Sequence, residues 1–135
     1  MTDDNIVIQN PLNDTIFLQN VEILTNRVHS FLIDIWNQDR SEIQLDVLQL
    51  RPDWTLAFWV SENEPANKPL GRKFNISHRS AYSLKINGNS IDIFSNQTTK
   101  VLTLFTRNVN RNYYLNIQNR EGQKNFYFLK VNLPN

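Results

Sequence analysis

The sequence predicts an all-β fold, a single antiparallel β-sandwich domain that spans residues 1–135. Short apolar and β-branched stretches recur along the chain with polar residues between them, a pattern typical of sandwiches and barrels. Asn87-Gly88 separates two alternating runs, which is the signature of a β-hairpin with a positive-φ turn. A chain of 135 residues also has the size of one ordinary domain with one core.

The candidate strands share a composition rich in β-branched and aromatic residues and are bounded by turn-forming residues. They run near Ile6 to Ile8, Ile16 to Leu24, Ser30 to Trp36, Glu42 to Leu50, Trp54 to Val60, Lys73 to Ser77, Ala81 to Asn87, Ser90 to Ser95, Lys100 to Arg107, Tyr113 to Gln118 and Asn125 to Leu133. Asn is abundant and Gly is scarce, so we expect Asn to form several of the turns between them.

Alternation predicts which strands are half-buried and which lie deep. In the run from Tyr82 to Ile86, the apolar side chains share one face and Ser83 and Lys85 share the other. The runs 101–105 and 126–129 are apolar on both faces, as expected of central strands or of strands covered on both sides.

Residues 14–36 also fit a helix, because their large apolar side chains recur at helical spacing after a possible cap at Asn13 or Asp14. The same stretch is crowded with β-branched residues, which favour strands. We therefore predict two strands here and keep an N-terminal helix as the alternative. The polar segment 61–71 holds two Pro and one Gly and predicts an exposed connecting loop that crosses between the two sheets.

Two families of sandwich are similar to this chain in the order of their features. The first similarity is carried by Phe31 to Asn37, Glu42 to Leu50, Pro52 to Thr55, Phe74 to Ser77 and Tyr82 to Ile86. In this order the chain resembles immunoglobulin-type sandwiches of the bacterial accessory kind. The stretch from Asp53 to Val60 instead resembles jelly rolls of the lectin or laminin-G type.

Several classes of protein are not indicated by the composition. The acidic start Met1-Thr2-Asp3-Asp4 lacks the regions of a signal peptide, no Cys is present, and no apolar run is long enough to span a bilayer. We therefore expect a cytoplasmic protein without a transmembrane segment.

Catalytic and cofactor motifs are also missing from the sequence. Each of the two His, His29 and His78, is adjacent to a Ser, but neither lies in a Gly-rich elbow, and His29 and Ser30 would point to opposite faces of a strand and could not form a catalytic dyad there. The three Gly are isolated and form no phosphate-binding loop, and the His spacing indicates no metal site. The carboxylates between Asp34 and Asp53 fit the polar faces and turns of strands. We expect a non-enzyme that binds no cofactor or metal.

The charge distribution is the most unusual feature of the sequence. Residues 1–67 carry three basic and eleven acidic residues, whereas residues 68–135 carry eleven basic and two acidic residues. Complementary charges of this kind suit association between proteins, so the leading hypothesis is a binding or assembly module with a protein partner or with itself.

Two alternative ligands remain open. Aromatic residues alternate with cations in the basic half, so a nucleic acid could be bound by its candidate residues Arg72, Lys73, Arg107, Arg111, Tyr113, Tyr114 and Lys124. Trp54 and Trp59 are predicted to face opposite sides of one strand, so one of them could be exposed to a protein, a carbohydrate or a lipid.

Overall fold

A computed structural model of the chain describes residues 6–9, 11–12, 15–33, 42–51, 53–88, 90–95, 102–106 and 110–133, with the backbone alone for residues 19 and 102–106. Within these ranges the chain forms eleven strands and no helix. The strands are β1 (Ile6–Ile8), β2 (Ile16–Ile23), β3 (Val28–Ile33), β4 (Glu42–Gln49), β5 (Leu56–Glu62), β6 (Phe74–Ile76), β7 (Arg79–Asn87), β8 (Ser90–Ser95), β9 (Leu102–Thr106), β10 (Tyr113–Asn119) and β11 (Asn125–Asn132).

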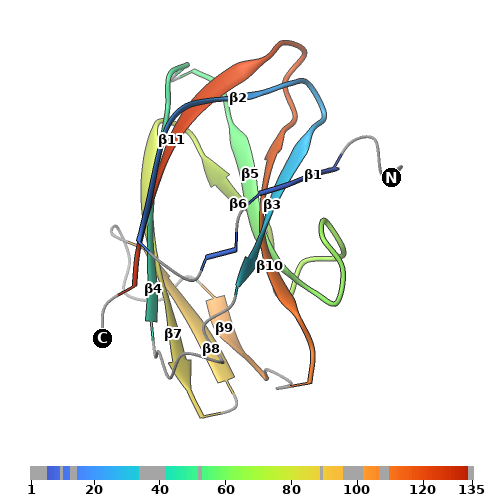
Figure 1. Cartoon of the computed structure of the whole chain (residues 1–135), viewed down its shortest axis with the longest axis vertical. Helices are drawn as coiled ribbons and strands as arrows, with labels where there is room; N and C mark the ends of the chain where they lie inside the picture. Colours follow the sequence, from blue (N-terminus) through green and yellow to red (C-terminus); the bar gives the residue numbers. More distant parts are fainter. Residues whose placement is uncertain are drawn as a thin grey trace.

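The strands form two sheets that pack face to face, as Figure 1 shows from the side. Sheet A has the order β1-β3-β10-β5-β6, and sheet B has the order β2-β11-β4-β7-β8-β9. The predicted β-sandwich is therefore confirmed. One pair departs from the antiparallel arrangement, because β1 runs parallel to β3.

Eight of the strands are paired in a nested order. β2 pairs with β11, β3 with β10, β4 with β7 and β5 with β6, all antiparallel, so the outermost strands of this series pair first and the innermost strands form the last pair. This nesting is the strand order of a jelly roll. The immunoglobulin-type alternative is not supported, since its last two strands form a hairpin in one sheet whereas β10 and β11 lie in different sheets.

The strand predictions agree with the structure to within about two residues at the ends that are described, the usual scatter of strand boundaries. Residues 16–23 and 28–33 are strands, so the alternative of a helix is wrong there. The loop within 61–71 was wrongly expected to cross between sheets. It joins β5 to β6, which are neighbours in sheet A, and it folds over the face of sheet A that points away from sheet B (Figure 1).

The main core lies between the two sheets. Alternate residues of each strand point into it, for example Tyr82, Leu84 and Ile86 of β7, as the alternation predicts. The run 126–129 was expected to be deep on both faces, but only Tyr127 and Leu129 are buried. Phe126 and Phe128 are half-buried on the other face, because β11 is internal to sheet B but only its inner face meets sheet A.

The turns use Asn as expected. Asn20, Asn26 and Asn63 are three of the four non-glycine residues with positive φ in the described ranges. The predicted hairpin joins β7 to β8, but Asn87 is still in β7 and pairs with Ser90, so the turn begins one residue later, at Gly88, whose φ is 58°. Asn20 lies where the register of β2 against β11 shifts, so a left-handed residue accommodates a β-bulge in this edge strand.

Candidate functional site

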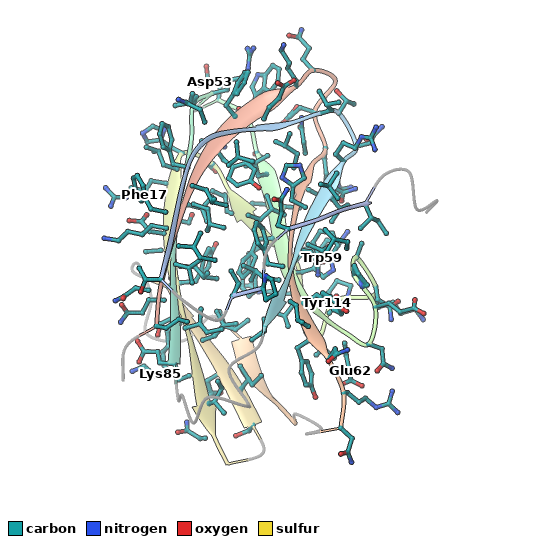
Figure 2. All side chains as sticks on the ribbon, in the orientation of Figure 1. Phe17, Asp53, Trp59, Glu62, Lys85 and Tyr114 are labelled. Atoms are coloured by element: carbon teal, nitrogen blue, oxygen red, sulfur yellow. The ribbon has the colours of Figure 1, made fainter. Side chains whose placement is uncertain are left out.

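The outer face of sheet B points away from sheet A and carries several large apolar side chains, whereas a strand face in contact with water is usually polar. Phe17 of β2 is 58% exposed and Leu50, directly after β4, is 48% exposed. Phe126 and Phe128 of β11 and Leu48 of β4 are half-buried beside them. Figure 2 shows Phe17 projecting away from the sandwich, on the side opposite to Trp59. We call this surface the B face.

The strand register orders the side chains of the B face into rows that run across the sheet. The central row is Phe17, Lys130, Asp46 and Ala81, contributed by β2, β11, β4 and β7 in turn. On one side of it lies the row Phe128, Leu48 and Arg79, followed by Phe126 and Leu50. On the other side lies the row Asn132, Gln44, Ser83 and Phe94.

Two shallow hollows flank the centre of the B face. One has a volume of about 360 Å³ and lies over β4, β7 and β8, with Ala81, Ser83 and Phe94 among its lining residues. The other has a volume of about 320 Å³ and is lined by Phe17, Leu48, Phe128 and their charged neighbours. Both hollows are bordered by Asp46 and Lys130, so the two form one uneven surface around this pair of charges.

The charges on the B face have mixed signs. The Arg79 guanidinium donates two hydrogen bonds to the Asp46 carboxylate, from Nε to Oδ1 at 3.1 Å and from Nη2 to Oδ2 at 2.7 Å. This contact raises the pKa of Arg79 above its already high usual value. Lys130 lies beside Asp46 in the register. The ammonium of Lys85 lies 5.1 Å from the ring centre of Phe94, so cations border the apolar side chains.

Of the residues predicted to bind a ligand, Lys73 and Trp59 are in contact on sheet A, and Arg72 precedes Lys73 just before β6. The indole of Trp59 is only 1% exposed, because the loop between β5 and β6 covers it and its Nε1–H donates to the carbonyl of Asn67 at 2.8 Å. The Lys73 ammonium lies 4.2 Å from the ring centre of Trp59, and burial, then Arg120, lowers the pKa of Lys73. Arg72 lies 4.8 Å from the ring centre of Phe74.

The other candidate residues are dispersed over the molecule. Tyr113 is buried in the core and Tyr114, on the outer face of sheet A, is half-buried. Arg111 lies just before the start of β10. Lys124 lies just before the start of β11, on the B face. Trp54 precedes β5 instead of lying in it and is covered in part by Arg51, 4.5 Å from its ring centre. Arg107 lies outside the described residues.

The two oppositely charged halves of the sequence are interleaved by the fold. Asp46 pairs with Arg79 at 2.7 Å, Glu62 with Arg111 at 3.5 Å and Glu22 with Lys124 at 3.9 Å. Each of these pairs joins a carboxylate from residues 1–67 to a cation from residues 68–135. The two halves of the sequence therefore carry opposite charges, but the jelly-roll pairing of the strands brings these charges side by side, where they partly neutralise each other.

The outer face of sheet A is closed by a buried polar cluster under the loop between β5 and β6. Asn116 is at its centre. Its Oδ1 accepts from the Ser30 hydroxyl at 2.7 Å and from the Ala66 N–H at 2.9 Å. Its Nδ2 donates to the Ser61 hydroxyl at 2.9 Å and to the Trp59 carbonyl at 3.2 Å. The loop is thereby fastened to three strands, and this face presents no open platform at Trp59.

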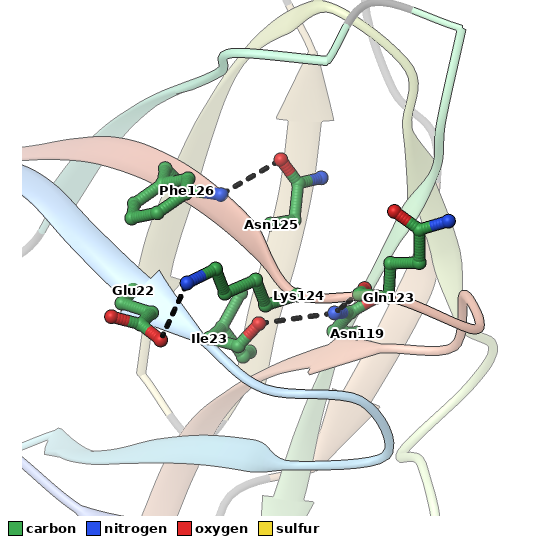
Figure 3. Close-up of polar contacts among 7 residues, drawn as sticks. All are labelled: Glu22, Ile23, Asn119, Gln123, Lys124, Asn125 and Phe126. Carbon is green, nitrogen blue, oxygen red and sulfur yellow. Dashed lines mark hydrogen bonds and ion pairs between the residues drawn. The ribbon is translucent and has the colours of Figure 1, made fainter.

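Buried amides also hold one end of the sandwich, shown in Figure 3. The Asn119 Nδ2 donates to the carbonyls of Ile23 at 3.0 Å and Gln123 at 2.8 Å, which ties β10 to the ends of β2 and β11. Asn125 donates to the Oε1 of Gln49 at 2.6 Å, and its own Oδ1 accepts from the Phe126 N–H at 2.7 Å. These side chains satisfy backbone groups where the chain crosses between the two sheets.

The two His occupy different environments. His29 lies between the sheets against Tyr127, and burial, with a smaller contribution from Arg27, lowers the pKa of His29 to about 4. His78 is exposed between β6 and β7. The neighbouring Ser30 hydroxyl points to the other face of β3, where it donates to Asn116. Within the described ranges, no three His, Cys, Asp or Glu residues come together as potential metal ligands.

Comparison with protein-family models, with curated proteins and with solved structures finds no match. In the described part of the chain, no helix has the length and hydrophobicity needed to cross a membrane. The function must therefore be inferred from the surface itself.

The B face was missed in the sequence because its residues come from three distant segments. Phe17, Asp46 and Lys130 carry no mutual signal until the pairing of β2, β11 and β4 is known. One signal was present: the stretch from Phe126 to Leu129 has large apolar residues on both faces although only one face can meet the other sheet. Such a strand indicates an apolar outer surface.

Proposed function

We propose that this chain is a non-enzymatic binding or assembly module whose ligand is a protein and whose binding surface is the B face. The observation that carries the proposal is the exposed Phe17 beside Phe128 and Leu48, with shallow hollows on both sides of Asp46 and Lys130. An apolar centre with flanking charges of both signs is the composition of a protein interface. Phe is one of the aromatic residues enriched in the centre of such interfaces.

The charges of the B face favour a protein over a nucleic acid. A nucleic-acid surface needs a continuous run of cations along the phosphate path, without carboxylates between them. On the B face Asp46, Glu42 and Glu22 lie among the cations, and Asp46 already holds Arg79. Mixed charges instead select one partner with the complementary pattern.

The Trp side chains give little support to carbohydrate or lipid binding. Trp59 is covered by the loop between β5 and β6, and Arg51 covers part of Trp54. A sugar platform needs an open aromatic face on which the ring can lie. In the part of the chain that is described, the most exposed aromatic side chain is Phe17, and it lies beside a shallow hollow with charges of both signs instead of in a polar cleft.

The proposal is tested by capture from an extract of the source organism on immobilised protein. The wild type is compared with Phe17→Lys and Phe128→Ser on the B face and with Ile8→Lys as a matched control. Ile8 is 59% exposed, like Phe17, but lies on β1 of sheet A. We expect a defined set of proteins that the B-face variants lose and the Ile8 variant keeps.

Other outcomes would redirect the assignment. Capture that both B-face variants leave unchanged contradicts the B face as the binding surface. Recovery of nucleic acid, detected by its absorbance and released by added salt, would favour the nucleic-acid alternative. A shift of Trp emission on addition of glycans or liposomes would promote the carbohydrate or lipid alternative.

A further inference from the structure

We infer that the partner bound by the B face is a second copy of this chain, in a two-fold symmetric dimer whose axis runs along the strands between β11 and β4. This inference rests on the proposed function and names its partner. In a symmetric dimer the same surface serves on both copies, so it must complement itself. The rows of the B face can therefore be tested for self-complementarity residue by residue.

A two-fold axis parallel to the strands keeps each row in place and exchanges the strands on its two sides. β11 of one copy then faces β4 of the other, and β2 faces β7. In the central row, Lys130 lies opposite Asp46 of the second copy. Symmetry makes this contact twice, so the interface gains two ion pairs at its centre and brings no like charges together in that row.

The adjacent rows place apolar side chains opposite each other under the same operation. Phe128 faces Leu48 of the second copy, and Phe126 faces Leu50 of the second copy. On the other side of the centre, Asn132 faces Gln44, and these two side chains already hydrogen-bond within one chain at 3.0 Å. The match of apolar with apolar and amide with amide extends over three rows beside the central row of ion pairs.

The most exposed aromatic side chain falls opposite a hollow. Exchange of β2 with β7 puts Phe17 over Ala81 of the second copy, the smallest side chain of the central row. Ala81 lines the hollow of about 360 Å³ that continues to Ser83 and Phe94. The protruding Phe17 ring and the hollow at Ala81 lie in the same row, on two strands that the axis exchanges. Each ring would therefore enter the hollow of the other copy.

An axis across the strands does not give this match. It would set each strand against its own copy and exchange the rows on the two sides of the central row, so that Lys130 would face Lys130 of the second copy and Asp46 would face Asp46. Charged groups would then lose water without gaining a partner. The axis along the strands also leaves the strands of the two facing B sheets nearly aligned, which is the usual geometry for sheets packed face to face.

The size of the B face sets the strength of the dimer. Five strands about 4.8 Å apart and about seven residues long present roughly 550 Å² in projection. Stable interfaces bury about 800 Å² on each partner, so the dimer belongs to the small and weak class. It should form as the concentration rises through the micromolar range and dissociate in part as salt screens the central ion pairs.

The test is sedimentation equilibrium of the full chain over a wide concentration range, with charge reversals at the centre. Lys130→Glu places the introduced glutamate opposite Asp46, and Asp46→Lys places the introduced lysine opposite Lys130. Each variant alone should dimerise at least about tenfold more weakly than the wild type. Lys68→Glu, exposed in the loop on sheet A, is the matched control and should dimerise like the wild type.

Mixing the two variants gives the decisive readout. In a mixed dimer both central contacts again join opposite charges, so the mixture should regain the wild-type dimer. Within each chain residues 130 and 46 remain like-charged neighbours, so a defect of folding cannot be repaired by mixing. Melting curves of the separate variants show that each is folded.

The outcomes separate this inference from the proposed function. A wild type that remains monomeric at every concentration, or a mixture that fails to dimerise, overturns the inference. If capture of another protein still depends on Phe17, the proposed function stands without it. If both the dimer and the capture are absent, both proposals fail.

Discussion

The Nδ1 of His29 lies 2.6 Å from the hydroxyl oxygen of Tyr127, and this hydrogen bond crosses the core from β3 of sheet A to β11 of sheet B. Both side chains are buried, and their ring centres are 5.6 Å apart. The pair therefore connects the two layers of the jelly roll by a polar contact inside a largely apolar core. Such contacts constrain how the sheets sit on each other, because a shift leaves a buried polar group without its partner.

His29 gives the fold a pH dependence whose sign is fixed by its burial. The pKa of His29 falls from 6.5 to about 4 in the folded chain, so between these values the unfolded chain binds more protons. The free energy of unfolding should therefore drop as the pH is lowered from 6.5 towards 4, by an amount of order 3 kcal/mol. Urea unfolding across this range should show a shallower dependence for His29→Gln than for wild type. His78→Gln, at an exposed position, is the control. Equal slopes for wild type and His29→Gln would contradict the assignment.

The hydrogen bond between the sheets should appear as an energetic coupling. Tyr127→Phe removes the hydroxyl and leaves the Nδ1 of His29 without its partner, at a cost of about 1–3 kcal/mol. His29→Leu leaves the Tyr127 hydroxyl unpaired at a comparable cost. The double variant should be less destabilised than the sum of the two by about 1 kcal/mol or more, measured by urea unfolding. Additive effects would show that the contact does not stabilise the sandwich.

Asn116 should control the loop over sheet A. Asn116→Ala removes the acceptor for the Ser30 hydroxyl and for the Ala66 N–H, so we expect a loss of about 2–3 kcal/mol. Hydrogen exchange at residues 64–67 should accelerate, and the emission of Trp59 should shift to longer wavelength as the loop opens. Asn75→Ala, at an exposed position of β6, should change neither. Unchanged exchange in the loop would mean that Asn116 does not fasten it.

Asn119 offers an isosteric test of the amides at the end of the sandwich. Asn119→Asp keeps the shape but turns a donor to two carbonyls into a carboxylate that repels them. We expect a loss of about 2–3 kcal/mol at neutral pH. The loss should shrink in acid, because protonation restores a donor and the folded state raises the pKa of the new carboxyl group. Thermal unfolding of Asn119→Asp beside Asn75→Asp measures it. A loss that does not depend on pH would count against this role of the amide.

Much of the fold could be predicted because the strand pattern is local. The alternation in Tyr82 to Ile86 and the hairpin near Asn87-Gly88 depend on adjacent residues only, and both are confirmed, with the turn one residue later than predicted. The pairing of distant strands is not local, so the choice between the two kinds of sandwich remained open. The loop between β5 and β6 was misplaced for the same reason: its position depends on Asn116, which is 50 residues from Ala66.

The candidate site was harder to predict than the fold. Trp54 and Trp59 were predicted to face opposite sides of one strand, so that one of them could be exposed, yet Trp54 precedes β5 and the loop covers the face to which Trp59 points. The charge split between the two halves of the sequence suggested separate faces, yet the nested pairing sets Asp46 beside Arg79 and Lys130. Only the register of sheet B shows that Phe17, Asp46, Lys130 and their neighbours share one face.

The central claim is that the B face is covered when the protein is bound. Hydroxyl-radical footprinting, read by mass spectrometry on dilute protein, on concentrated protein and on protein in extract, measures this directly. The account predicts that labelling of Phe17 and Leu50 falls in the concentrated protein or in the extract, whereas Ile8, which is comparably exposed on sheet A, stays unchanged. Equal labelling of Phe17 in all three conditions would contradict it.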